Sequence, residues 1–114
     1  MRLVYLFVLL SGCATSYPQI DYGNAPPRDW PRLTQSVMYG TESEVKAWCS
    51  RDPRLASGRK AGCALLYFDL GRCYIYLTSK DPELLKHEQA HCNGYVHVGD
   101  GDIAHRAVQD WKRK

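Results

Sequence analysis

Three of the four histidines of the chain lie in one short segment, HEQAHCNGYVH, at residues 87–97. His87 and His91 are four residues apart, so on a helix their side chains lie one turn apart on the same face and can reach one metal ion. Gly94 would permit a sharp turn that brings His97 back towards that ion. These residue types and spacings predict a metal site with three imidazole ligands.

Glu88 follows the first histidine directly. From its angle on the helix it cannot easily be a third ligand, but its carboxylate can hold a water molecule at the metal. If His97 is instead an ordinary loop residue, another side chain must complete the site. The alternatives for that position are His105, Asp100 and Asp102.

The helix that must hold the first two histidines is predicted over residues 82–93. Asp81 is a favourable N-cap, and Pro82 suits the first helical position. Gly94 accepts the left-handed conformation with which helices commonly end. One face of this helix would carry Leu84, Leu85, Glu88, His91 and Cys92.

Two β-rich runs, CALLYFD (63–69) and RCYIYLT (72–78), precede this helix. Only Leu70 and Gly71 separate them, which predicts a hairpin with a two-residue turn. Such a turn places Phe68 opposite Cys73, Leu66 opposite Ile75 and Ala64 opposite Leu77. These six residues would form one apolar face of the hairpin.

Four cysteines follow Cys13, and an even number in a small exported domain predicts two disulfides. In the expected register Cys63 and Cys73 point to opposite faces, so they cannot bond to each other. Of the two remaining pairings we favour Cys49–Cys63 with Cys73–Cys92. The reason is that the apolar face of the hairpin should pack on the helix that carries Cys92.

Three further elements complete the expected α+β domain. A short strand is predicted over residues 36–40, and a helix over 42–50 that begins with a capping box. A C-terminal amphipathic helix is marked by Ile103, Ala107, Val108 and Trp111. We therefore expect a β-hairpin or small antiparallel sheet packed on the metal-binding helix, with short N- and C-terminal helices and two disulfides.

The N-terminal residues indicate export. Leu3 to Leu10 is an apolar run of eight residues, which is far shorter than the roughly 20 that span a bilayer but is typical of a signal peptide. The following Leu-Ser-Gly-Cys resembles the lipobox of bacterial lipoproteins, which implies removal of residues 1–12 and a lipid on Cys13. The residue after Cys13 is Ala14 and not Asp. By resemblance to the usual sorting rule for lipoproteins, this implies the periplasmic face of the outer membrane. The other reading is an ordinary secretory signal.

The rest of the chain divides into residues 13–31, a lipidated N-terminus and proline-rich tether, and 32–114, the domain. Without Arg2 the chain has 14 basic side chains against 12 acidic ones. Because these charges are not clustered, no nucleic-acid partner is expected. The expected contacts are the membrane, through Cys13, and the substrate of the metal site.

The segment at residues 87–97 resembles the zinc motif of the metzincin metallopeptidases, HExxHxxGxxH, at all five fixed positions. In that family an edge strand that binds substrate, and a second strand, also precede the active-site helix. The resemblance covers residues 63–97. It implies Zn²⁺ held by His87, His91 and His97, with Glu88 as the catalytic base. The chain departs from the family in having no methionine after Met38, where metzincins place a methionine turn beneath the metal, and in having only 17 residues after His97.

Together, resemblance and chemistry predict a lipid-anchored, minimal zincin-like metallopeptidase that hydrolyses peptide bonds in a peptide or protein substrate. Zinc lowers the pKa of a bound water to about 7, and Glu88 would accept its proton and pass it to the leaving amine. Candidate oxyanion donors are Tyr95, His105, Tyr74 and Tyr76. Within the enzyme class, a peptidoglycan peptide is a second substrate. The alternative class is a non-catalytic structural or binding lipoprotein stabilised by zinc.

Overall fold

The computed structural model describes residues 18–52 and 61–114 as a small α+β fold. The elements follow in the order β1 (Thr34–Tyr39), α2 (Glu42–Cys49), β2 (Gly62–Tyr67), the 3₁₀ turn η2 (Phe68–Leu70), β3 (Arg72–Leu77), α3 (Pro82–Cys92) and α4 (Ile103–Lys112). The expected signal peptide and Cys13 lie outside the described residues. Within them, no helix has the length and apolar character needed to cross a membrane.

The sheet is mixed, with the strand order β1-β3-β2. Strand β2 pairs with β3 in antiparallel fashion, as the hairpin prediction requires, whereas β1 pairs with β3 in parallel. The expectation of an antiparallel sheet is therefore wrong for β1. A parallel pair needs a long connection, and here α2 and β2 both lie between the two strands in the chain.

The predicted hairpin register is wrong by two residues. Leu66, rather than Phe68, lies opposite Cys73, and Ala64 lies opposite Ile75. The cause is the turn, which takes up Phe68–Leu70 as 3₁₀ and then Gly71 in the left-handed region at φ 65°. Because side chains alternate with a period of two, this shift leaves each residue on its predicted face.

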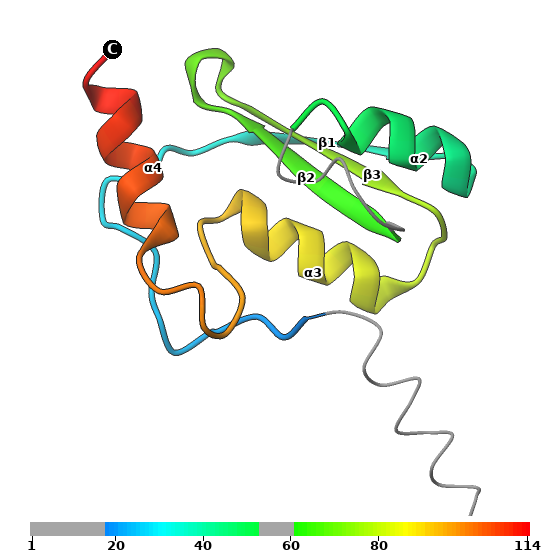
Figure 1. Cartoon of the computed structure of the whole chain (residues 1–114), viewed down its shortest axis with the longest axis horizontal. Coiled ribbons are helices and arrows are strands. Elements are labelled where there is room, and N and C mark those ends of the chain that lie inside the picture. Colours follow the sequence, from blue (N-terminus) through cyan, green and yellow to red (C-terminus); the bar gives the residue numbers. More distant parts are fainter. Residues whose placement is uncertain (1–17, 53–60) are drawn as a thin grey trace, which may run out of the picture.

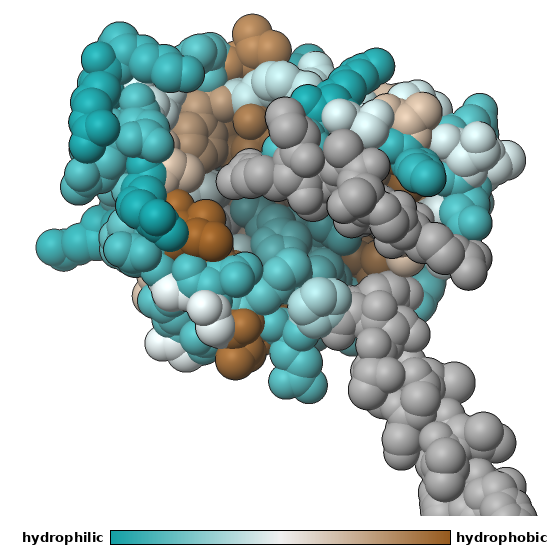
Figure 2. Space-filling model, viewed as in Figure 1, coloured by the Kyte–Doolittle hydropathy of each residue, from teal (hydrophilic) through white to brown (hydrophobic). Residues whose placement is uncertain are grey.

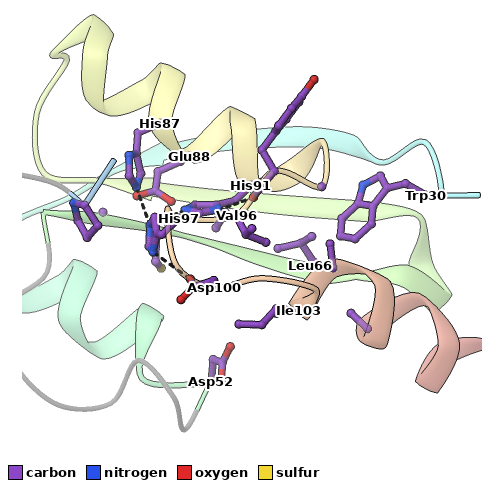
Figure 3. Close-up of a pocket in the computed structure, with 18 of the residues that line it drawn as sticks. Trp30, Asp52, Leu66, His87, Glu88, His91, Val96, His97, Asp100 and Ile103 are labelled. Atoms are coloured by element: carbon purple, nitrogen blue, oxygen red, sulfur yellow. Dashed lines mark hydrogen bonds and ion pairs between the residues drawn. The ribbon is translucent and has the colours of Figure 1, made fainter. Parts of the chain in front are cut away.

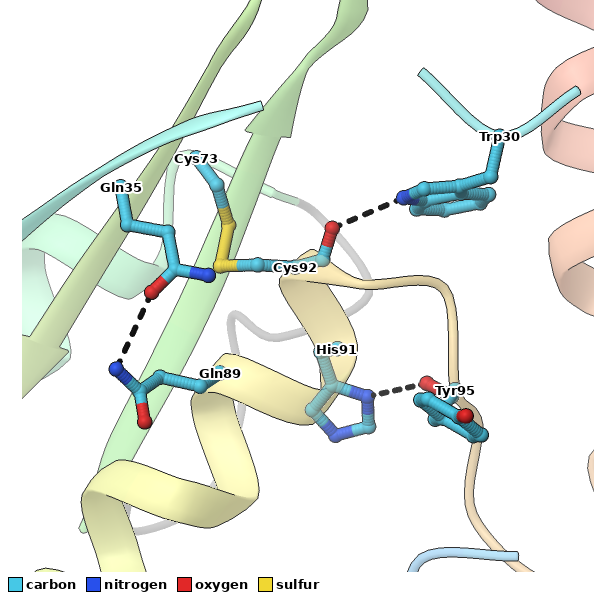
Figure 4. The surroundings of a disulfide bond; sticks show 7 residues. All are labelled: Trp30, Gln35, Cys73, Gln89, His91, Cys92 and Tyr95. Carbon is cyan, nitrogen blue, oxygen red and sulfur yellow. Dashed lines mark hydrogen bonds between the residues drawn. A yellow bond between two sulfur atoms is a disulfide. The ribbon is translucent and has the colours of Figure 1, made fainter. Parts of the chain in front are cut away.

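The two helices α2 and α3 cover opposite faces of the sheet (Figure 1). On one face Val45 and Cys49 of α2 pack against Cys63 and Leu65. The other face packs on α3 through a second buried cluster: Cys73, Ile75, Leu77, Leu84 and Cys92. One disulfide lies in each layer, Cys49–Cys63 and Cys73–Cys92, which is the pairing that the sequence favoured. The second ties the C-terminal end of α3 to the central strand (Figure 4).

Helix α4 lies at the turn end of the hairpin (Figure 1). The Trp111 indole donates a hydrogen bond of 2.9 Å to Asp69 Oδ1, and its ring contacts Phe68 edge-on. Lys112 forms an ion pair with Asp29. Ala104 and Val108 are the buried residues of this helix. The helix thereby closes one end of the space between α3 and β2.

Candidate metal centre

Helix α3 positions two of the three clustered histidines. It begins as predicted: the Asp81 side chain accepts a hydrogen bond of 2.9 Å from the backbone N–H of Glu83, and Pro82 occupies the first turn. These caps fix where the helix starts. Within the helix, the spacing of four residues places His87 and His91 one turn apart on one face. Their ring centroids are 4.9 Å apart.

The chain turns sharply after α3 and brings the third histidine back. Asn93 caps the helix, and Gly94 follows at φ 93°. The side chain of His97 then lies beside those of the helix, as Figure 3 shows. Its Nε2 atom is 3.0 Å from the Nε2 of His91 and 3.2 Å from that of His87.

The three imidazoles fit a shared metal ion. Zinc binds histidine nitrogen at about 2.0–2.1 Å, so two nitrogens in a tetrahedral zinc site lie roughly 3.3 Å apart. The separations of 3.0 and 3.2 Å between Nε2 atoms are close to that value. Within the described residues, these three histidines are the one group of metal-binding side chains whose ligand atoms converge. No described fourth ligand closes the site.

Polar contacts on the far side of two of the rings favour the metal-binding tautomer. His91 Nδ1 lies 3.0 Å from the backbone carbonyl of Tyr95 (Figure 4), and since a carbonyl only accepts, Nδ1 must carry the proton. His97 Nδ1 faces Asp100 Oδ2 at 3.5 Å, which favours the same tautomer. The Nε2 lone pairs of His91 and His97 then face each other at 3.0 Å. Such an arrangement is unfavourable unless a cation lies between the two atoms.

Protonation of His87 or His91 does not supply that cation at neutral pH, because the pKa of each ring is lowered. Burial, followed by the neighbouring His91 and His97, lowers the pKa of His87 to about 4. Burial also lowers the pKa of His91, although its hydrogen bond to the Tyr95 carbonyl opposes the shift. The two imidazoles are therefore neutral at pH 7, which is the form that binds metals.

Glu88 is the buried acidic residue of the site, with 5% of its surface exposed. It extends from α3 beside His87 (Figure 3), and it is the one carboxyl or basic side chain among the described buried residues. Burial raises the pKa of its carboxyl group to about 8. No described residue forms a hydrogen bond or ion pair with it. A carboxyl group in such surroundings is suited to exchanging a proton near neutral pH.

A cavity of about 650 Å³ opens over these side chains. Figure 2 shows the recess on this face, with hydrophilic residues of α3 within it and hydrophobic residues beside it. One end holds the three histidines and Glu88. The other end is apolar: Trp30, Leu66 and Ile103 lie there in Figure 3, with Ala104 and Ala107 of α4. One wall is formed by four residues of β2: Gly62, Cys63, Ala64 and Leu66.

The other candidate residues fall in different places. Tyr95 lines the cavity, whereas Tyr74 and Tyr76 pack against the α2 cluster on the opposite face of the sheet. His105 is exposed and is absent from the cavity lining. Asp102 is exposed and pairs with Arg106. Asp100 supports His97 from behind the ring and is not placed as a ligand.

Sequence reasoning missed the contribution of residues before β1. Trp30 lines the cavity and donates a hydrogen bond of 2.9 Å to the Cys92 carbonyl. Ile20 forms an isolated antiparallel bridge with His97. Residues 18–31, expected as a tether, thus lie against the domain at the site. Their prolines gave no signal of these contacts.

Gly94 is a position where we expect even a small side chain to destabilise the fold. A Cβ added there would lie 2.8 Å from Pro26 Cβ and 2.8 Å from the Trp30 ring, in a backbone conformation with φ 93°. We expect Gly94→Ala to destabilise the fold by about 2–4 kcal/mol in urea unfolding, because strain and a clash act together. Gly99→Ala is the matched control, since Gly99 has the same φ but no atom within 4 Å of an added Cβ. Equal losses for both variants would show that the clash contributes nothing.

Comparison of the chain with models of protein families, with curated proteins and with solved structures found no match.

Proposed function

We propose that the protein is a zinc metallopeptidase of the metzincin-like, minimal zincin kind, acting in the bacterial cell envelope. The observation that carries the proposal is the convergence of three imidazole nitrogens beside a buried carboxyl group with which no described residue pairs, in an open cavity. A structural zinc site is closed by four protein ligands and has no use for such a group. Three neutral ligands with an open position are typical of catalytic zinc sites.

The proposed division of labour follows from where the residues lie. His87, His91 and His97 would hold the zinc ion, which when bound lowers the pKa of a coordinated water to about 7 and polarises a carbonyl. In its ionised form, Glu88 would accept the proton of the attacking water and deliver it to the amine that leaves. Tyr95 is the one candidate oxyanion donor among the four predicted that lines the cavity.

The edge of β2 supports a peptide as the substrate. Among the described strands, β2 pairs only with β3, so its other edge has no strand partner. Residues Gly62, Cys63, Ala64 and Leu66 of β2 line the cavity. An extended peptide can add to a free strand edge through backbone hydrogen bonds. Its scissile bond would then pass the histidines, and the apolar end of the cavity would receive one of its side chains.

Metal removal and return tests the proposal. The purified protein should bind one equivalent of Zn²⁺ and cleave a mixture of peptides, lose cleavage on chelation, and regain it when Zn²⁺ is added back. Peptidoglycan fragments form a second arm of the substrate test. Zinc binding without cleavage in either arm would contradict the peptidase and favour a zinc-stabilised binding protein. The proposed lipid on Cys13 is checked separately, by whether the protein needs detergent for extraction from membranes.

A further inference from the structure

The residues on both sides of His97 are bonded to a segment far away in sequence. Residues 93–102 between α3 and α4 contain three glycines with positive φ, Gly94, Gly99 and Gly101. Glycine has the largest conformational freedom to lose on folding, so such a loop is costly to order. His97 lies in its middle. The loop's own hydrogen bonds to the backbone of α3 end at Tyr95, whose N–H donates to the Ala90 carbonyl at 3.0 Å, so His97 depends on contacts from outside the loop.

Residues 18–30, which we name the N-terminal strap, form four hydrogen bonds with this loop and with Cys92, the residue before it. Two backbone hydrogen bonds bracket His97: Asp21 N–H donates to the Val96 carbonyl at 2.8 Å, and Val98 N–H donates to the Gln19 carbonyl at 2.9 Å. The bridge between Ile20 and His97 lies between these two bonds. The backbone on both sides of the third ligand is therefore fixed by the strap.

The other two contacts hold the ends of the loop. Asn24 Nδ2 donates to the Gly101 carbonyl at 2.8 Å. At the start of the loop, Trp30 Nε1 donates to the Cys92 carbonyl at 2.9 Å (Figure 4). Between these ends, the rings of Tyr22 and Tyr95 are in contact, with centroids 5.3 Å apart. The contacts extend from the last residue of α3 almost to the first residue of α4.

We infer that the N-terminal strap is a positioning element of the metal centre, and that the three-histidine site is complete only while the strap is docked. If docking is lost, His97 samples many positions, and only a fraction of molecules presents all three nitrogens together. The apparent dissociation constant for the metal rises by the inverse of that fraction. The inference rests on the metal-binding part of the proposed function and not on catalysis.

The substitution Asp21→Pro tests the strap, because it removes one backbone hydrogen bond between the strap and the loop. Asp21→Pro removes the N–H that bonds to Val96, whereas the matched control Asp21→Ala keeps it and removes only a side chain that accepts a bond from Gly23. We expect Asp21→Pro to weaken Zn²⁺ binding about tenfold in calorimetry, from one lost hydrogen bond and the looser loop. Asp21→Ala should remain within about twofold of wild type.

Cobalt gives a readout that a general loss of stability would not change. With Co²⁺ in place of Zn²⁺, the visible absorption of the wild type should indicate tetrahedral coordination. In Asp21→Pro, at Co²⁺ concentrations that saturate the site, this absorption should be weaker and closer to that of a six-coordinate ion. Thermal melting in chelator establishes that the variant is folded.

If Asp21→Pro does not fold, Asn24→Ala tests the inference instead, because it removes only the hydrogen bond to the Gly101 carbonyl. We expect this variant to bind zinc about threefold to fivefold more weakly. Wild-type affinity and cobalt spectra in the folded variants would overturn the inference while leaving the metal site intact. A wild-type protein that binds no metal would overturn the metal site and the inference together.

Discussion

Glu88→Gln should abolish peptide cleavage while leaving the zinc in place. Glutamine keeps the size of the side chain but cannot accept a proton from water, and general base catalysis contributes about 10²–10⁴-fold. The ligand atoms belong to the three histidines, so zinc stoichiometry should remain one. The measurements are cleavage of the best substrate from the peptide mixture and metal content after dialysis.

The control is the same substitution at an exposed position of the same helix. Glu83→Gln lies in the first turn of α3, where the side chain is exposed and absent from the main cavity, and it should retain full cleavage. Cleavage by Glu88→Gln at the wild-type rate would remove Glu88 from the mechanism. Loss of zinc from Glu88→Gln would instead make the carboxylate part of the metal-binding set, contrary to its predicted role.

The helix of the site could be predicted from sequence because its signals are local. The Asp81 cap, Pro82 and the glycine after Asn93 are all within one turn of the helix ends, and the structure has α3 within one residue of the predicted bounds. The disulfide pairing could also be predicted from the sequence. It depends on which face a residue occupies, and a register error of two residues leaves the faces unchanged.

The missed features depend on contacts between segments far apart in the chain. The parallel pairing of β1 with β3 joins Thr34 to Arg72, and neither strand carries a pattern that specifies its neighbour. The strap is held chiefly by backbone groups of Gln19, Asp21 and Val98, for which side-chain identity gives no signal. The three histidines that could hold a metal ion were identified from their spacing, whereas the support for His97 could not be.

The same Glu88→Gln substitution should stabilise the metal-free protein at alkaline pH. Burial raises the pKa of the Glu88 carboxyl from 4.5 to about 8, so the folded state holds a proton that the unfolded state releases above pH 4.5. The stability that this proton contributes is fully present below pH 4.5 and is lost as the pH rises to about 8. The pKa difference corresponds to roughly 3–5 kcal/mol. Glutamine does not titrate, so the variant avoids this loss.

Urea unfolding in chelator at a series of pH values measures the effect. The free energy of unfolding of Glu88→Gln minus that of wild type should rise by several kcal/mol between pH 5 and pH 9. The constant cost of burying an amide cancels in this change. The lowered pKa values of His87 and His91 cost stability below about pH 6.5 in both proteins, so they cancel as well. Parallel curves would mean that the carboxylate is hydrated in the folded state, which would argue against a desolvated base beside the metal.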